Sequence, residues 1–237
     1  MIPKISVITV TYNVKKSIEE TILNVINLKY NNLEYIIIDG GSTDGTVDVI
    51  KKYENKLSYW VSEPDNGIYD AMNKGWSKVD DDSFILYLGA GDKIINLPDM
   101  NLYSKNDLIY GDVALGEKRI FKSTVGWRSF FGNTIHHQAM LIHKSIHFMP
   151  PFSLDFKIYS DFDFNQRLLK RGIRFHKDKD FLAFALEGGV SEQINIEEIQ
   201  KVVRKNYGFL MSKMAFIYLK LQQLNEYRKN NSSNSSI

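Results

Sequence analysis

Short apolar runs alternate with helical patterns through the first 92 residues. Runs rich in β-branched and aromatic residues predict strands at residues 5–10, 35–38, 57–61 and 84–88. Apolar residues spaced three and four apart predict helices at residues 14–28, 47–53 and 68–78. Thr43 or Asp44 is placed to cap the second helix. Strands that alternate with helices indicate an α/β fold with a mostly parallel, doubly wound sheet, because right-handed crossovers are nearly obligatory.

The pattern changes after Asp92. Residues 107–110 and 139–143 predict strands, and residues 113–122 predict a hairpin that turns at Gly116. A helix is expected at residues 161–170, with Ser160 as its cap and Gly172 just past its end. The second half of the sheet is therefore expected to be mixed rather than parallel.

The chain divides into one large domain and a C-terminal extension. Residues 1–192 are expected to form the domain, with halves at 1–95 and 96–192. A long helical pattern rich in Lys, Arg, Tyr, Phe and Met runs from Ile196 to about Arg228, so a helical extension is expected at 193–229. Residues 230–237 are almost all Asn and Ser, which predicts a disordered tail.

The composition narrows the class of protein. The 237 residues are 43% hydrophobic, which is enough to fill one large α/β core. Lys and Arg number 30 against 28 Asp and Glu, so the charge balance gives no indication of nucleic-acid binding. The absence of cysteine excludes disulfides and thiolate metal sites. The N-terminus enters a strand pattern without a leader, and no apolar run approaches the ~20 residues of a bilayer span, so a cytosolic protein is expected.

A polar turn follows the second predicted strand at residues 39–46, which read Asp-Gly-Gly-Ser-Thr-Asp-Gly-Thr. Ligands of open α/β sheets bind at the carboxyl ends of the strands, where such loops lie. Glycines allow the backbone to approach a ligand, and the Asp39 carboxylate can accept hydrogen bonds from a base or sugar. An isolated Asp-Gly pair is more often a simple turn, so this motif alone leaves both interpretations open.

Three ordered motifs together are more specific. Residues 7–13 (VITVTYN), 39–46 (DGGSTDGT) and 63–75 (EPDNGIYDAMNKG) resemble the family 2 glycosyltransferases, which have the GT-A fold. The resemblance covers roughly residues 4–190. It implies a Rossmann-like, mostly parallel twisted sheet with a nucleotide-binding half at 1–95 and a mixed, acceptor-binding half at 96–192.

The resemblance also implies a set of nucleotide-sugar contacts. Tyr12 would stack on the base and Asp39 would hydrogen-bond it, most often a uracil, since stacking needs a flat ring and recognition of a base N–H needs an acceptor. The residues expected to bind the nucleotide sugar are Thr11, Tyr12, Asn13, Asp39, Ser42, Asp44, Asp65, Gly67, Asn73, Lys74 and Gly91.

Asp92 matches the last aspartate of the family's Asp-X-Asp metal motif. The departing nucleoside diphosphate requires charge neutralisation, and a hard cation such as Mn²⁺ or Mg²⁺ suits oxygen ligands. The segment Gly89-Ala90-Gly91-Asp92 supplies one carboxylate where many members have two or more. Asp92 as a strand-end turn residue is the alternative.

The acceptor hydroxyl requires a base, and residues 160–167 resemble the family's Glu-Asp segment with Ser160 in place of the glutamate. Asp161 would be that base, and its position in the first turn of a helix favours the ionised form. A role in complementing the helix dipole is the alternative. His137 and Gln138 match a His-Gln pair near the acceptor pocket and are expected to orient sugar hydroxyls. The four histidines between 136 and 147 lack the spacing of a zinc site.

Two further segments allow more than one interpretation. Gly188-Gly189-Val190-Ser191 resembles a loop that closes over the diphosphate, and is equally an ordinary turn. The C-terminal helix interleaves basic and aromatic residues, which fits contact with an anionic membrane, or packing on the domain or on a second copy in a homodimer.

The sequence therefore predicts an inverting glycosyltransferase that uses a nucleotide sugar, expected to be a UDP-sugar. The expected acceptor is a glycan or lipid-linked molecule in surface polysaccharide biosynthesis, and the expected location is the cytoplasm, with peripheral contact to the inner face of the membrane. Two alternatives stay open. A nucleotidyltransferase would need a Gly-rich phosphate loop after the first strand, which residues 11–14 lack. An inactive carbohydrate- or nucleotide-binding protein would explain the single metal carboxylate and Ser160.

Overall fold

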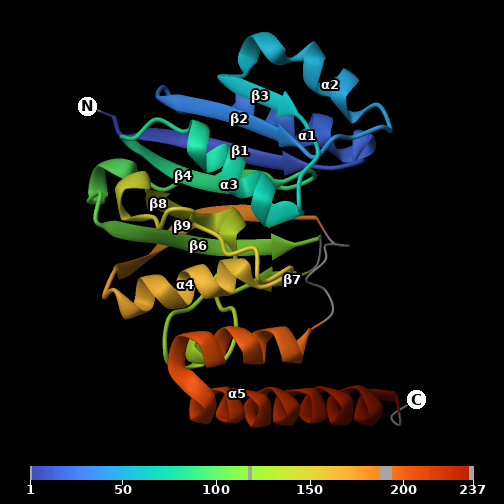
Figure 1. The fold of residues 1–237 in the computed structure, drawn as a ribbon, viewed down its shortest axis with the longest axis vertical. Coiled ribbons are helices and arrows are strands. Elements are labelled where there is room, and N and C mark those ends of the chain that lie inside the picture. Colours follow the sequence, from blue (N-terminus) through green and yellow to red (C-terminus); the bar gives the residue numbers. More distant parts are fainter. Residues whose placement is uncertain (1, 117–118, 187–193, 235–237) are drawn as a thin grey trace.

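The computed structural model describes residues 2–116, 119–186 and 194–234, with side chains up to residue 225. Its strands join one nine-stranded sheet in the order β3-β2-β1-β4-β8-β6-β9-β5, with β7 paired to β6 (Figure 1). The strands are β1 (Lys4–Thr11), β2 (Leu33–Asp39), β3 (Tyr59–Ser62), β4 (Ser83–Gly89), β5 (Lys93–Asn96), β6 (Asp107–Leu115), β7 (Arg119–Phe121), β8 (Met140–His143) and β9 (Arg174–Ala185).

The first four strands are parallel, as the alternation of strands and helices predicts. In register, Thr11 of β1 lies beside Asp39 of β2, and Val10 lies beside Gly89 of β4. The carboxyl ends of β2, β1 and β4 therefore meet at one edge of the sheet. Neighbouring strands are about 4.8 Å apart, so the ends of β2 and β4 are separated by about 10 Å.

Helices cover both faces of this half. Helices α1 (Lys15–Ile26) and α2 (Thr46–Lys52) pack on one face, and α3 (Ile68–Lys78) packs on the other with α4 (Ser160–Lys170). Alternation along β1 directs Ile5 and Val7 to the first face and Ile8 and Val10 to the second. Helix α3 lies so close to the sheet that a Cβ on Gly75 would be 2.5 Å from Ile8 Cγ2.

The second half is mixed, as predicted. Strand β6 pairs antiparallel with β8 and parallel with β9, while β5 pairs antiparallel with β9. The register of β6 and β9 shifts at Gly111, where an added Cβ would lie 2.0 Å from the Phe181 carbonyl oxygen. The extra residues, 178–181, lie on β9 opposite Gly111, so the glycine makes room for a bulge of the neighbouring strand.

Two details of the helices differ from the prediction. Ser160 is the first residue of α4 rather than its cap: Tyr159 is at the N-cap position, and the buried Ser160 hydroxyl donates to the Ser153 carbonyl oxygen at 2.7 Å. Gly172, with φ +72°, ends the helix as predicted. Helix α5 (Ile196–Asn234) continues to Asn234, past residue 229, where the helical extension is predicted to end.

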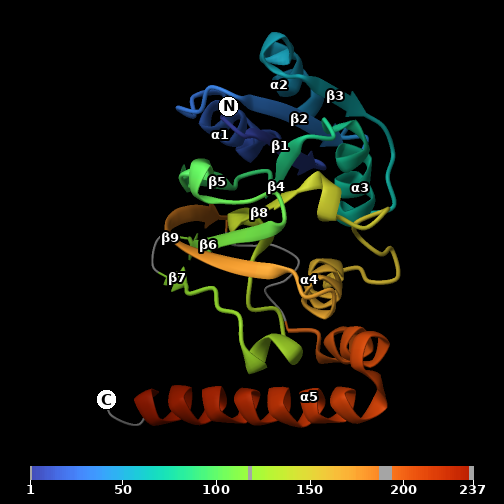
Figure 2. The ribbon, with the colours of Figure 1, turned by 90° about the vertical axis from the view of Figure 1, so that its left-hand side faces the viewer.

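Helix α5 has two segments. The backbone leaves the helical conformation at Gly208, where φ is 86° and ψ is −177°. Residues 196–207 pack on α4 through an apolar cluster that contains Phe162, Ile199 and Val203. Residues after Gly208 turn away and lie at the end of the molecule farthest from α2 and β3 (Figures 1 and 2). Within the described residues, every helix is too short or too polar to cross a membrane.

Candidate active site

The loops after β1 and β2 bind each other through side-chain to backbone hydrogen bonds. The Asn13 backbone N–H donates to Ser42 Oγ at 2.7 Å, and the Thr43 N–H donates to Asn13 Oδ1 at 2.9 Å. Asn13 has a φ of 52°, a left-handed conformation that asparagine tolerates better than most residues. The two predicted nucleotide loops are therefore one structural unit at the edge of the sheet.

Asp39 is completely buried at the centre of this unit. Its Oδ2 accepts hydrogen bonds from the N–H groups of Gly41 (3.1 Å) and Ser42 (2.8 Å) and from the Ser62 hydroxyl (2.6 Å), while the Ser42 hydroxyl donates to Oδ1. A carboxylate has about four acceptor positions. Four internal donors occupy the carboxylate and none of its surface is exposed, so in this structure Asp39 holds the loop in shape.

The rest of the unit extends to both sides of Asp39. Asp44 Oδ1 accepts from the Thr46 N–H at 2.9 Å, and its Oδ2 accepts from the Lys15 N–H at 3.0 Å; the hydrogen bond from the Thr46 hydroxyl is the main cause that lowers the pKa of Asp44. Asp65 Oδ1 accepts from the Gly67 N–H at 2.8 Å, and a Cβ on Gly40 would lie 2.5 Å from Asp65 Oδ2. Asp65 therefore lies directly against the loop after β2.

Tyr12 and Thr11 end β1 at the same edge. The Tyr12 side chain is 62% exposed, which leaves its ring accessible for stacking. Thr11 is buried, and its hydroxyl has no hydrogen-bond partner in the described part of the chain. An unpaired buried hydroxyl beside an exposed aromatic ring is a feature expected of a ligand-binding edge.

Asn73 and Lys74 do not contribute free groups to this edge, although the sequence predicts nucleotide-sugar contacts for both. The Asn73 amide donates to the Phe152 carbonyl oxygen at 2.8 Å and accepts from the Phe152 N–H at 3.0 Å. Lys74 Nζ donates to the Pro64 carbonyl oxygen at 2.8 Å and pairs with Glu63 at 2.9 Å. Both side chains lie on α3 and point to neighbouring loops, so helix periodicity assigns them a supporting role.

Asp92 follows the end of β4 and is 6% exposed. Its Oδ2 accepts from the Gly89 N–H (2.8 Å) and from Gln138 Nε2 (3.1 Å), and its Oδ1 accepts from the Leu186 N–H (3.0 Å). Burial raises the pKa of Asp92 above its usual range, and the hydrogen bonds oppose this effect. Gly91, with φ +98°, makes the tight turn that directs the carboxylate inward.

The His137-Gln138 pair connects Asp92 to Asp161. Gln138 Nε2 donates to Asp92, whereas its buried Oε1 has no partner in the described structure. His137 Nδ1 lies 3.7 Å from Asp161 Oδ2. Two adjacent residues thus bridge the carboxylate at the end of β4 and the carboxylate at the start of α4, which are 69 positions apart in the sequence.

Asp161 is 8% exposed and accepts hydrogen bonds from three donors. The Phe162 N–H (2.8 Å) donates to Oδ1, and Asn133 Nδ2 donates to Oδ2 at 2.8 Å. The single proton of the Tyr69 hydroxyl is shared between Asp161 Oδ1 (3.1 Å) and the Ile158 carbonyl oxygen (2.6 Å). Burial, followed by the charge of Asp161, raises the pKa of Tyr69 well above its usual range, so its hydroxyl stays protonated as a donor. The carboxylate is held in one orientation by side chains from α3 and from the loop before β8 and by a backbone N–H of α4.

Tyr69 and Asn133 are site residues that the sequence interpretation did not single out. Tyr69 lies inside the 63–75 motif, directly before Asp70, but the motif gives no indication that its hydroxyl reaches a residue 92 positions later. Asn133 lies in an irregular loop, and its amide oxygen accepts in turn from Asn165 at 3.2 Å. Only the tertiary structure identifies these two as the groups that orient Asp161.

The histidines near this site lie in different surroundings. Burial lowers the pKa of His136 to about 4 and that of His147 to about 3. His147 packs between Trp76 and Phe164, away from His137. Within residues 2–116, 119–186 and 194–234, no group of three or more His, Asp or Glu side chains gathers as a metal site. The predicted loop at Gly188–Ser191 lies outside the described residues.

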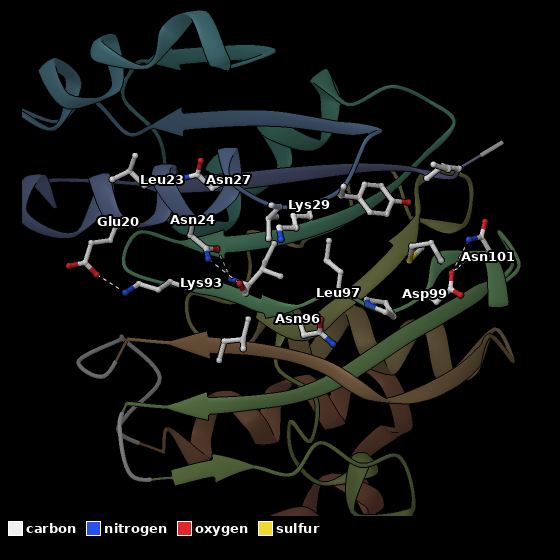
Figure 3. Close-up of a pocket in the computed structure, with 17 residues that line it drawn as sticks. Glu20, Leu23, Asn24, Asn27, Lys29, Lys93, Asn96, Leu97, Asp99 and Asn101 are labelled. Atoms are coloured by element: carbon white, nitrogen blue, oxygen red, sulfur yellow. Dashed lines mark hydrogen bonds and ion pairs between the residues drawn. The ribbon is translucent and has the colours of Figure 1, made fainter.

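A large hollow lies elsewhere, between α1 and the segment after β5 (Figure 3). Its volume is about 980 Å³. The polar groups that line it are already paired: Lys93 with Glu20 at 2.8 Å, and Asn24 with the Ile94 backbone at 2.8 and 3.0 Å. None of the predicted site residues lines it. The predicted site residues therefore lie outside this hollow.

The residues around Asp92 can accommodate a divalent cation. The carboxylate and the unpaired Gln138 Oε1 are oxygen donors of the kind that Mg²⁺ and Mn²⁺ prefer, and phosphate oxygens and water complete such sites. Because Asp92 is the single carboxylate at this position, the ion would need diphosphate oxygens to complete its ligands.

A parallel half with a polar carboxyl edge, joined to a mixed half that holds a buried aspartate, defines the GT-A class of glycosyltransferases. Two solved structures share this fold. S. aureus TarS 1-349 in complex with UDP-GlcNAc has a TM-score of 0.63 and 19% identity, over 85% of this chain and 65% of that one. The mannosyltransferase PcManGT from Pyrobaculum calidifontis, in complex with GDP-Man and Mn²⁺, has a TM-score of 0.62 and 16% identity, over 90% and 68%.

The sequence comparisons agree with the fold. The model of glycosyl transferase family 2 matches residues 6–92. A PGL/p-HBAD biosynthesis glycosyltransferase of Mycobacterium tuberculosis is 28% identical over 184 residues, which is 70% of this chain and 69% of the relative. Residues 6–92 are therefore similar to glycosyl transferase family 2, and the relative that matches over most of the chain is a glycosyltransferase.

Proposed function

We propose that this protein transfers a sugar from a nucleotide diphosphate sugar, a UDP-sugar, to an acceptor hydroxyl with inversion at the anomeric carbon. The observation that carries the proposal is the bridge from Asp92 through Gln138 and His137 to Asp161. It supports a site with one carboxylate near the nucleotide and a second carboxylate near the acceptor. Transfer needs both, one near the leaving diphosphate and one near the attacking hydroxyl.

The nucleotide would lie across the carboxyl ends of β1 and β2. Tyr12 is exposed for stacking on the base. Asp39 is completely buried, so it would accept from a base N–H only after the loop that it holds has opened. Complexes of the two GT-A neighbours with UDP-GlcNAc and with GDP-Man support a nucleotide-sugar donor. We propose uracil rather than guanine because residues 39–46 resemble the family motif whose aspartate most often hydrogen-bonds uracil.

Asp161 would act as the base. The acceptor oxygen forms a bond to the anomeric carbon from the face opposite the diphosphate, and its proton passes to Asp161. The bond from the anomeric carbon to the diphosphate oxygen breaks, and its electron pair leaves with the nucleoside diphosphate. Hydrogen bonds from Tyr69 and Asn133 hold the carboxylate for this transfer.

Asp92 would hold a Mn²⁺ or Mg²⁺ ion together with diphosphate oxygens. When bound, the ion neutralises negative charge on the departing diphosphate. Gln138 Nε2 donates to Asp92 Oδ2 and so fixes the Asp92 side chain. The Oε1 of Gln138, which has no partner in the described structure, would bind the donor sugar or the ion.

The acceptor would be a glycan or a lipid-linked molecule in surface polysaccharide biosynthesis, reached at the inner face of the cell membrane. The name of the M. tuberculosis relative, a PGL/p-HBAD biosynthesis glycosyltransferase, supports a non-protein acceptor. Ser160, which replaces the glutamate of the Glu-Asp segment, is buried and hydrogen-bonded to Ser153, so it contributes to the loop rather than to chemistry.

The test is a donor screen on the purified chain. Thermal shift with a panel of UDP- and GDP-sugars, each with Mn²⁺, identifies the donor, because a ligand that prefers the native state raises its melting temperature. Release of nucleoside diphosphate is then measured with and without acceptor glycans. We expect one donor to stabilise the protein and to be turned over. Binding without turnover on any acceptor would favour an inactive binding protein, and release of pyrophosphate would favour a nucleotidyltransferase.

A further inference from the structure

The second segment of α5 has two apolar faces, and only one of them is covered. Ser212, Ala215 and Leu219 are buried against the rest of the protein. A second set follows the helix at spacings of four, three, four and three residues and is between 48% and 74% exposed. These residues, which we call the outward face, are Leu210, Met214, Ile217, Leu221 and Leu224.

Large apolar side chains are concentrated on this segment. Of the twenty exposed large hydrophobic residues in the described structure, seven lie between residues 209 and 224. Five of these form the outward face, and the other two, Phe209 and Phe216, lie beside it. Soluble proteins seldom expose a continuous apolar surface of this kind unless it binds something. The segment from 209 to 225 is about 25 Å long, so the surface is long and narrow.

The charges beside the outward face are all positive. Residues 199–225 contain five Lys and Arg and no Asp or Glu. Lys213 and Arg204 lie over the Phe209 ring, at 5.3 and 5.6 Å, and Lys220 lies over Phe216 at 5.9 Å. Each cation thus lies at the border of the outward face, where its charge can contact the same surface that the apolar side chains contact.

This charge pattern decides between two occupants. The four-three spacing also suits a helix from a second copy, but such a pair would bring Lys213 and Lys220 of both copies together, and no acidic residue lies between positions 199 and 225. An anionic lipid surface complements the same arrangement, because it accepts the apolar stripe into the acyl boundary and the lysines at the headgroups. We propose that the outward face of α5 docks on an anionic membrane surface.

Docking there would orient the active site. Tyr218 of α5 contacts the rings of Trp127 and Phe131, with centroids 5.4 and 5.6 Å apart. The chain continues from these residues to Asn133, whose amide holds Asp161. Phe131, which Tyr218 of the helix contacts, is therefore only two residues before Asn133, which holds Asp161. Delivery of a lipid-linked acceptor to Asp161 rests on the proposed function, whereas docking itself does not.

The experiment is flotation of the full chain with two kinds of vesicle. One contains phosphatidylcholine alone, and the other contains phosphatidylcholine with about 40% phosphatidylglycerol, which gives the anionic surface that attracts basic segments. We expect binding to the anionic vesicles, weakened by salt. L210S/I217S/L224S should abolish it. K213Q/K220Q should weaken it about 25-fold, on the order of five-fold for each lysine near an anionic surface.

The matched control is L23S/I95S, which removes two exposed apolar residues that line the hollow of Figure 3, and it should float as the wild type does. Wild-type flotation of L210S/I217S/L224S would overturn the proposal, as would equal binding to neutral vesicles without salt dependence. A dimer in light scattering that L210S/I217S/L224S converts to a monomer, with no flotation of the wild type, would assign the face to a second copy. Nucleoside diphosphate release with a soluble acceptor should be unchanged in that variant, so a failure of docking is distinguishable from a failure of catalysis.

Discussion

Asp39 and Asp161 are both buried carboxylates, but their hydrogen-bond donors come from different distances along the chain. The donors to Asp39 lie two, three and 23 positions away. The side-chain donors to Asp161 lie 28 and 92 positions away. The first site is built largely by its own loop, whereas the second exists only once α3, the loop before β8 and α4 have packed together.

The comparison indicates how each half can fail. Disturbance of the Asp39 loop should weaken donor binding and local stability, because the loop is both the binding surface and its own support. Disturbance around Asp161 should reduce turnover while the donor still binds, because the acceptor half is assembled on a separate part of the sheet.

The largest expected effect is that of Asp161→Asn. Loss of the base should lower kcat by about 1,000-fold with little change in the affinity for donor. Timed assays of nucleoside diphosphate release measure kcat, and a thermal melt of the same variant shows whether it is folded. Asp155→Asn, at an exposed acid that pairs with Lys205, is the control and should retain activity. Turnover of Asp161→Asn at the wild-type rate would remove this residue from the mechanism.

Asp92→Asn is expected to lower kcat by about 100-fold and to abolish stimulation by Mn²⁺. An amide can accept in place of only one carboxylate oxygen, so either the Gly89 N–H or the Leu186 N–H loses its partner, and the charge that faces the diphosphate is lost. Metal titration of the two proteins in parallel measures this. An unchanged metal response in the variant would place the ion elsewhere.

Asp39→Asn tests the other half. We expect a loss of about 2–3 kcal/mol in the free energy of unfolding, because a buried charged acceptor is replaced by a group that leaves donors unpaired. Donor affinity should fall with it. Urea denaturation and a donor titration measure both effects, and Asp44→Asn at the exposed end of the same loop should change stability far less. A fully stable Asp39→Asn protein would show that the loop does not depend on this carboxylate.

The smallest expected effect concerns acid sensitivity. All five histidines lie in the second half of the chain, and burial lowers the pKa of His147 to about 3. Between pH 6.5 and about 3 the unfolded state binds the proton and the folded state does not, so stability is complete above pH 6.5 and falls as the pH decreases, by about 1.4 kcal/mol per pH unit for this one group. His147→Phe should remove that slope, as measured by denaturation at pH 7 and pH 5. His176→Phe, at a partly exposed histidine, is the control. An identical slope in His147→Phe would assign the acid sensitivity to other groups.

Much of the first half could be predicted because its signals are local. Apolar runs fix the parallel strands, and the 7–13 and 39–46 motifs lie where the strands end. The predictions that Asn73 and Lys74 contact the nucleotide sugar stay untested, and the contacts of their side chains could not be predicted. A motif records that residues occur together, whereas the side of α3 on which each one lies depends on how the helix packs, and both side chains bind neighbouring loops.

The sequence by itself determined the α/β class, the family resemblance, and the presence of carboxylates at positions 39, 92 and 161. The tertiary structure alone decided that Gln138 and His137 connect the last two, that Tyr69 and Asn133 orient the base, and that one face of α5 is left uncovered. The reason is that strand and loop patterns are set by neighbours in the chain, whereas these contacts join residues tens of positions apart and form only when the layers pack.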